Sequence, residues 1–287
     1  MLLAGLMVTQ QVSAQNPGVI WEREISGEID YVIGEVKYTS DDGLIIVGTA
    51  QISEDNKDFF LARFSDGGDL LWLQYYGGPD DDIGNSVAEV NGGGFIIAGN
   101  TNSYGNGNED LIICRTEDDG DLSWQETYGT GGNEGGTRIR EVIDGFIVSG
   151  FQGGNNGAEL ILVKFDLYGE KIWAENYSQI GEFGLKTGTS VEPDGNNYIL
   201  SGTFESPNTK IDSRIIKVDS SGNVIWHYLV EGDGDDFIYD VKPTGNGYLV
   251  CGKSTIGEND TVNSRLVKLN SDGELIWDKE YKLRVNS

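Results

Sequence analysis

Short apolar runs alternate with glycine- and aspartate-rich segments along most of the chain, and no segment sustains the 3.6-residue period of an amphipathic helix. The stretch Trp72–Gly120 shows the pattern best. With the residues that follow, it predicts four strands, which we name A to D: Ser86–Val90, Phe95–Thr101, Asp110–Thr116 and Asp121–Tyr128. Strand B is apolar on both faces, as expected for a strand buried between neighbours. The A–B and C–D links are hairpin turns in which glycine accepts a positive φ.

This pattern recurs about every 50 residues and is marked by tryptophan. A basic residue precedes each later tryptophan by nine residues, a glycine precedes it by four, and a tyrosine or apolar residue follows it by four. Four antiparallel strands per repeat are typical of a propeller blade, and blades bury their faces by stacking. The repeated tryptophans are therefore interpreted as structural residues that pack on the next blade: Trp21, Trp72, Trp124, Trp173, Trp226 and Trp277.

The repeats predict an all-β propeller of about five four-stranded antiparallel blades. Their approximate bounds are 27–78, 79–130, 131–179, 180–231 and 232–283, and one extra strand precedes them at 19–26. Two alternatives stay open. One is a six-bladed ring that lacks part of a blade because the chain is truncated, and the other is an open arc or a ring closed by oligomerisation.

The run DLYGEKIW at 166–173 and its four copies, SDGGDLLW, EDDGDLSW, DSSGNVIW and NSDGELIW, resemble the tryptophan-docking motif of quinoprotein-like (PQQ-like) β-propellers. Over nearly all of residues 18–282 the repeats resemble those of secreted bacterial and archaeal propeller proteins. This resemblance implies an architecture and no activity. Quinoprotein dehydrogenases share a larger ring and commonly carry two adjacent cysteines. In this chain Cys114 and Cys251 lie far apart.

The N-terminus resembles a signal peptide over residues 1–14. A short apolar run, Leu2–Val8, is followed by Val12-Ser13-Ala14, which places small or apolar residues where a signal peptidase cleaves, although no basic residue precedes the run. We therefore expect a secreted or cell-surface protein with a single propeller domain at 15–287. No later run reaches about 18 apolar residues, so no membrane insertion is expected.

The 47 acidic and 20 basic residues give a formal charge of -27, which disfavours nucleic acid and anionic membranes as partners. Many of the acids fall in the D–A and B–C loops, which share one face of a propeller. Carboxylates in glycine-rich loops suit Ca²⁺, the one candidate cofactor, and solvated turn residues are the alternative interpretation. The candidate metal ligands are Asp80, Asp81, Asp82, Asp233, Asp235 and Asp236.

No catalytic residue is nominated. The single histidine, His227, falls on a predicted outer strand, and no serine lies in a G-x-S-x-G elbow. The sequence favours a non-enzymatic binding or structural module with an acidic loop face that recognises an extracellular carbohydrate or protein. The alternative is a hydrolase that cleaves extracellular polysaccharide with a carboxylate pair. The candidate ligand-binding residues lie in one loop: Tyr104, Asn106, Asn108 and Glu109.

Overall fold

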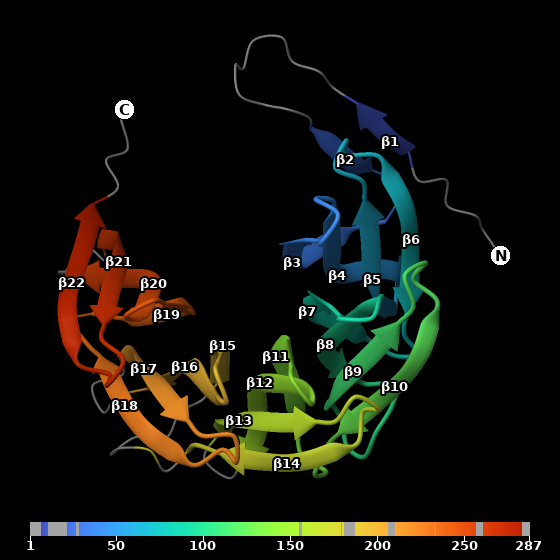
Figure 1. The fold of residues 1–287 in the computed structure, drawn as a ribbon. Coiled ribbons are helices and arrows are strands. Elements are labelled where there is room, and N and C mark those ends of the chain that lie inside the picture. Colours follow the sequence, from blue (N-terminus) through green and yellow to red (C-terminus); the bar gives the residue numbers. More distant parts are fainter. Residues whose placement is uncertain are drawn as a thin grey trace. The chain divides into compact units, whose positions relative to one another are not determined.

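The computed structural model describes residues 7–10, 22–26, 29–154, 157–178, 180, 187–205, 210–232, 234–256 and 261–282 (Figure 1). Across these residues the chain forms strands and turns without a helix, so it offers no apolar helix of membrane-spanning length. The chain divides into two compact units, residues 1–129 (unit 1) and 130–287 (unit 2). Five four-stranded antiparallel sheets, each built from four consecutive strands, give the described residues the organisation of a five-bladed β-propeller, as predicted.

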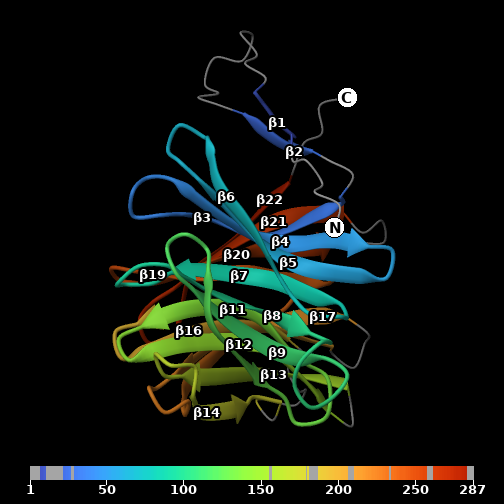
Figure 2. The ribbon, with the colours of Figure 1, turned by 90° about the vertical axis from the view of Figure 1, so that its right-hand side faces the viewer.

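Unit 1 holds two blades, which are stacked on each other (Figure 2). Blade 1 consists of β3 (Tyr31–Tyr38), β4 (Leu44–Ser53), β5 (Asn56–Phe64) and β6 (Leu70–Tyr76). Blade 2 consists of β7 (Asp82–Glu89), β8 (Phe95–Thr101), β9 (Asp110–Thr116) and β10 (Leu122–Tyr128). In every blade, strands A to D follow one another in chain order.

Unit 2 holds three blades. Blade 3 consists of β11 (Glu134–Val142), β12 (Gly145–Gly154), β13 (Gly157–Phe165) and β14 (Lys171–Asn176). Blade 4 consists of β15 (Thr187–Asp194), β16 (Asn197–Glu205), β17 (Ile211–Val218) and β18 (Val224–Val230). Blade 5 consists of β19 (Asp236–Thr244), β20 (Gly247–Ile256), β21 (Thr261–Leu269) and β22 (Leu275–Lys282).

The extra strand predicted at 19–26 is observed as β2 (Arg23–Ser26), and Trp21 lies outside the described residues. β2 pairs with β1 (Met7–Gln10) in a two-stranded sheet of their own and does not join a blade. β1 falls within the segment interpreted as a signal peptide.

Strand A begins four residues earlier than predicted in blade 2, at Asp82, because of a β-bulge. The ladder between β7 and β8 shifts register between Gly84 and Ser86, and the other four blades have the same bulge. The glycine of strand B lies opposite the bulge. A β-carbon on Gly99 would collide with the carbonyl oxygen of Ile83, so this close approach requires glycine.

The outer-strand tryptophan of one blade docks on the C–D turn of the next. Trp72 donates from Nε1 to the carbonyl oxygen of Asp118 at 3.0 Å, and a β-carbon on Gly120 would lie 3.0 Å from the Trp72 ring. The hydroxyl of Tyr76 donates to the carbonyl oxygen of Gly120 at 2.6 Å. Unit 2 repeats this contact, with Trp173 and Tyr177 on Gly222 and with Trp226 on Gly273. The glycine at this turn has a φ of 77–86° in all five blades, as predicted.

The repeated basic residue of strand C binds the A–B turn of its own blade. Arg63 pairs with Asp41, Lys164 with Asp144 at 2.6 Å and Lys217 with Asp194 at 2.9 Å. These contacts stabilise the end of the blade opposite the D–A and B–C loops.

The expectation that strand B is buried on both faces is wrong for blade 5. In β8 every residue is buried, whereas in β20 Tyr248 and Val250 are buried and the alternating residues Leu249 and Cys251 are exposed. Only one face of β20 contributes to the apolar cluster of blades 4 and 5. Both cysteines are free thiols, and Cys114 is buried.

We predict that Gly120→Ala destabilises the protein by about 3 kcal/mol. A left-handed backbone costs an alanine about 1–2 kcal/mol, and crowding of the Trp72 ring adds to this cost. Gly92→Ala is the matched control, because Gly92 also has a positive φ but no atom within 4 Å of its β-carbon position. Urea unfolding of both variants measures the difference, and equal losses would contradict the role of the docking contact.

Candidate functional site

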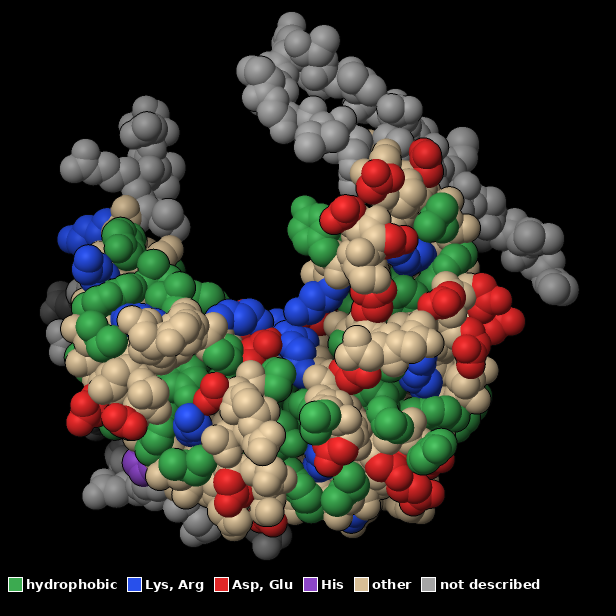
Figure 3. All heavy atoms as spheres, in the orientation of Figure 1, with side chains coloured by type: hydrophobic (Ala, Val, Ile, Leu, Met, Phe, Trp, Pro, Cys, Tyr) green, Lys and Arg blue, Asp and Glu red, His purple; other side chains and the backbone are tan. Residues whose placement is uncertain are grey.

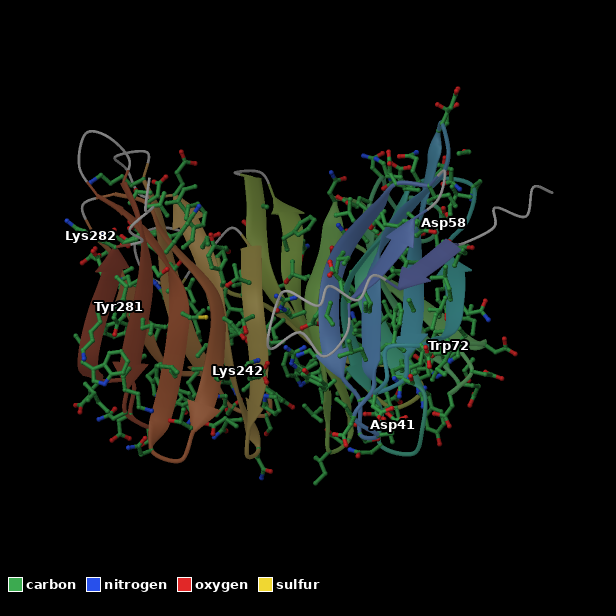
Figure 4. The ribbon with its side chains drawn as sticks, turned by 90° about the horizontal axis from the view of Figure 1, so that it is seen from above. Asp41, Asp58, Trp72, Lys242, Tyr281 and Lys282 are labelled. Carbon is green, nitrogen blue, oxygen red and sulfur yellow. The ribbon has the colours of Figure 1, made fainter. Side chains whose placement is uncertain are left out.

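The D–A loop of unit 1, residues 77–81, lies against residues from two B–C loops. Lys57 at the start of β5 donates its backbone N–H to Oδ1 of Asp81 at 3.0 Å. Ser103, after β8, binds the backbone of Asp80 with its hydroxyl oxygen, which is 3.0 Å from both the amide nitrogen and the carbonyl oxygen. In Figure 4 the label Asp58 marks this end of blade 1, and the label Asp41 marks the opposite end.

The three consecutive aspartates of this loop do not act as one group. Asp81 pairs with Lys57 at 3.3 Å, while Asp82 points into the protein and is fully buried. The side chain of Asp80 is exposed. Among the described residues, no three Asp, Glu, His or Cys side chains are grouped so that they could hold a metal ion.

Asp82 instead meets Asp58, a half-buried residue of β5 in the neighbouring blade that directly precedes the buried part of that strand. Oδ2 of Asp82 accepts hydrogen bonds from the backbone N–H of Gly78 and the hydroxyl of Ser103, both at 2.7 Å. A β-carbon on Gly77 would collide with Oδ1 of Asp58 and would lie 2.8 Å from Oδ2 of Asp82. The two carboxylates therefore converge over the backbone of Gly77.

Burial raises the pKa of Asp58, and the negative charges of Asp82 and Asp81 raise it further. A hydrogen bond from Nδ2 of Asn56, 3.2 Å from Oδ1 of Asp58, acts in the opposite direction. In the described part of the chain no ion pair joins a basic side chain to Asp58 or Asp82. The negative charge on Asp58 is therefore disfavoured where it lies, next to Asp82.

Unit 2 has the same pair of repeat positions, occupied by Asp212 and Asp236, but supplies a cation. Arg265 of β21 pairs with Oδ1 of Asp236, which is fully buried, and with Asp278 at 2.6 Å. Burial raises the pKa of Asp236, and Arg265 opposes that rise. Asp235 corresponds to Asp81, since it accepts the backbone N–H of Ile211 at 2.8 Å, and Asp233 lies outside the described residues.

A surface groove of about 290 Å³ lies beside Gly77, between the outer strands of blades 1 and 2. Its walls carry aromatic, amide and carboxylate side chains. Tyr75 and Tyr104 are 38% and 37% exposed, and the Tyr104 hydroxyl donates to the carbonyl oxygen of Gly77 at 3.0 Å. The residues that line the groove are Gln74, Tyr75, Tyr76, Gly77, Tyr104, Gly120, Asp121, Leu122 and Gln125.

Of the four residues proposed to bind a ligand, the structure brings only Tyr104 to this groove. Glu109 accepts a hydrogen bond from Asn100 at 3.0 Å, and Asn106 and Asn108 are exposed in the loop. Sequence reasoning missed Gln74, Tyr75 and Gln125, because they lie on strands interpreted only as scaffold. The sequence did contain a signal for these residues, because each is a polar side chain close to a docking residue: Gln74 and Tyr75 lie between Trp72 and Tyr76, and Gln125 follows Trp124.

A second hollow, of about 380 Å³, lies at the opposite end of unit 1 and has no aromatic wall. It is lined by Ser40, Glu89, Val90, Asn91, Gly92, Gly93 and Asp118. Its serine and glutamate bind each other, Ser40 Oγ donating to Glu89 at 2.6 Å. The groove at Tyr104 is therefore the better candidate for a ligand.

The remaining expectations concern charge and catalysis. His227 is exposed on β18, and partial burial together with the positive charge of Arg214 lowers its pKa. On the face drawn in Figure 3, acidic side chains (red) form several separate groups.

Comparison with known proteins supports the fold. No family model and no curated protein sequence matches the chain. The solved neuraminidase-like protein of a little yellow-shouldered bat isolate from Guatemala aligns over 86% of this chain and 81% of its own, with 12% identity and a TM-score of 0.51. That of a flat-faced bat isolate from Peru aligns over 85% and 70%, with 11% identity and a TM-score of 0.51. At this identity, the similarity shows a shared β-propeller fold alone.

We predict that Asp58→Asn flattens the pH dependence of stability. A carboxyl whose pKa is raised by folding binds its proton more tightly in the folded state, so its contribution worsens as the pH rises through that pKa. In metal-free buffer the variant should exceed the wild type in stability at pH 8, with the difference vanishing near pH 4. Urea unfolding across this range checks it. Asp80→Asn, which removes the same charge from an exposed position of the neighbouring loop, is the matched control.

We also predict that Arg265→Gln costs about 3–5 kcal/mol, because it leaves buried Asp236 with its charge uncompensated. Asp236→Asn should restore part of that loss when combined with Arg265→Gln. Urea unfolding of the single and double variants measures this coupling. Lys282→Gln, at an exposed site on β22, is the control and should change stability little. Additive losses in the double variant would show that the pair is not coupled.

Proposed function

We propose that the protein is a non-enzymatic binding module that recognises a neutral carbohydrate in the groove at Tyr104. The observation that carries this proposal is the pairing of two partly exposed tyrosines with two glutamines and an aspartate around about 290 Å³. Aromatic rings present apolar faces. Amides both donate hydrogen bonds to hydroxyl groups and accept them, and carboxylates accept them. A few polar groups on an apolar wall fit a sugar ring.

The charge of the protein supports a neutral ligand. A net charge of -27 repels sulfated, uronic or sialylated polymers, whereas neutral sugars are unaffected. Asp121 in the groove wall adds a local acceptor that suits hydroxyl groups and disfavours acidic ones. We infer recognition of a hexose or pentose oligosaccharide.

The competing function, polysaccharide hydrolysis by a carboxylate pair, has a specific pair to consider. Asp58 and Asp82 lie close together and the pKa of Asp58 is raised, as a general acid requires. However, Asp82 has no exposed surface, and its Oδ2 is held by Gly78 and Ser103. Neither residue lines the groove. A sugar chain in the groove would therefore not contact both carboxylates, which favours binding over cleavage.

We further propose that the protein is exported and that its repeats belong to the quinoprotein-like superfamily. The apolar segment before Val12-Ser13-Ala14 supports export. The docking of Trp72, Trp173 and Trp226 on the glycine turns of the next blades supports the superfamily, because this is the contact that its motif implies.

The test is a glycan array that carries neutral and acidic oligosaccharides, followed by calorimetry with each bound glycan. We expect neutral glycans to bind and Tyr104→Ala or Gln125→Ala to weaken binding about tenfold or more, since loss of one stacking or paired polar contact costs on the order of 1.4 kcal/mol. Tyr168→Ala is the matched control, because Tyr168 is 79% exposed and lies in a turn of unit 2.

Two outcomes would overturn the proposal. One is binding that the groove variants leave unchanged. The other is release of shorter oligosaccharides from a bound polymer, with loss of that activity in Asp58→Asn, which would establish the hydrolase.

A further inference from the structure

The convergence of Asp58 and Asp82 requires a compensating charge that the described residues do not provide. Both carboxylates reach the same point above the backbone of Gly77, one from β5 of blade 1 and the other from β7 of blade 2. From this geometry we infer that the pair is a binding site for a divalent cation, with the ligand chemistry of Ca²⁺, at the junction of the two blades.

A buried carboxylate oxygen without a hydrogen-bond partner supports a bound cation. Asp82 is fully buried, and its Oδ1 has no hydrogen-bond partner. Its Oδ2 is fixed by the two hydrogen bonds from Gly78 and Ser103, so the carboxylate is held in place beside Asp58. A buried carboxylate oxygen without a donor or a counter-ion is costly, and a bound cation removes that cost.

Neutral oxygens complete the site. Oδ1 of Asn56 is also buried without a partner, while Nδ2 lies 3.2 Å from both Oδ1 of Asp58 and the carbonyl oxygen of Gly78. A half-turn of this amide exchanges its nitrogen and oxygen and brings a third oxygen beside those two. Ca²⁺ accepts carboxylate, amide and carbonyl oxygens together with water, in a shell of six to eight.

The number of acids sets the expected affinity. With two carboxylates, the rest of the shell must come from neutral oxygens and water, which corresponds to a weak site of the kind found in extracellular modules. The expected Kd is about 10⁻⁴–10⁻³ M. Mg²⁺ should bind more weakly, because it requires a smaller and nearly octahedral shell.

The repeat supplies an internal comparison. At the corresponding position in unit 2, Arg265 compensates Asp236. The residue that corresponds to Arg265 in blade 2, three residues before the repeated base Arg115, is the buried Ile112. The nearby Lys57 is already paired with Asp81. Where unit 2 carries a guanidinium, unit 1 therefore takes its cation from solution.

The experiment uses the full chain in chelator-treated buffer near pH 7.5. Calorimetry with CaCl₂ should show one saturable site, and about 10 mM Ca²⁺ should raise the melting temperature by about 3 °C or more. Asp82→Asn and Asp58→Asn should lose most of this rise. Asp80→Asn is the matched control: it removes the same charge from the same loop but should keep the rise, which separates the site from general screening of an acidic protein.

A reversal of order is the sharper signature. In EDTA, Asp58→Asn should be at least as stable as the wild type, whereas in Ca²⁺ the wild type should be the more stable protein. An equal Ca²⁺ response in Asp58→Asn and Asp80→Asn would overturn the proposal. So would a wild type without a saturable response, since no cation would then bind between the two carboxylates. Should Asp82→Asn fail to fold, the partly exposed Asp58 supplies the decisive variant.

Discussion

The docking of an outer-strand tryptophan on the glycine of the next C–D turn is the contact on which each unit depends. A four-stranded sheet has two faces and cannot bury both alone. The Trp72 ring and the Tyr76 hydroxyl both contact Gly120, which has no side chain, so the packing of the Trp72 ring against the Gly120 backbone sets the spacing of blades 1 and 2. Because the turn lies at one end of the stack, the D–A and B–C loops of neighbouring blades are brought together at the other end.

This dependence explains how much of the fold the sequence predicts. Three of the four strands of blade 2 were predicted to within one residue at each end, because the 50-residue period repeats every turn signal several times. The start of strand A was predicted too late. Asp82 and Gly84 have the composition of a turn, yet the bulge keeps them in the ladder. A local irregularity of this kind has no composition that distinguishes it from a loop.

The candidate site was predicted less well, for two physical reasons. Strand A begins at Asp82, and consecutive residues along a strand point to opposite faces. The side chains of Asp81 and Asp82 therefore cannot share a ligand. The partner of Asp82 is Asp58, which lies in the preceding repeat and becomes a neighbour only when blades stack. The groove likewise draws Gln74 and Gln125 from different blades. Contacts between repeats cannot be derived from the repeat itself.

The bulge of strand A also distinguishes one blade interface from another. It turns the residue that follows it toward the neighbouring blade, where Ser86 donates to Glu35 at 2.5 Å, while in unit 2 Ser190 donates to Asp240 at 2.6 Å. The carboxylate belongs to the earlier blade in the first case and to the later blade in the second. Blades with the same scaffold are thus not interchangeable: an exchanged pair would set carboxylate against carboxylate or hydroxyl against hydroxyl. This polarity opposes misassembly of neighbouring repeats during folding, a characteristic failure of repeat proteins.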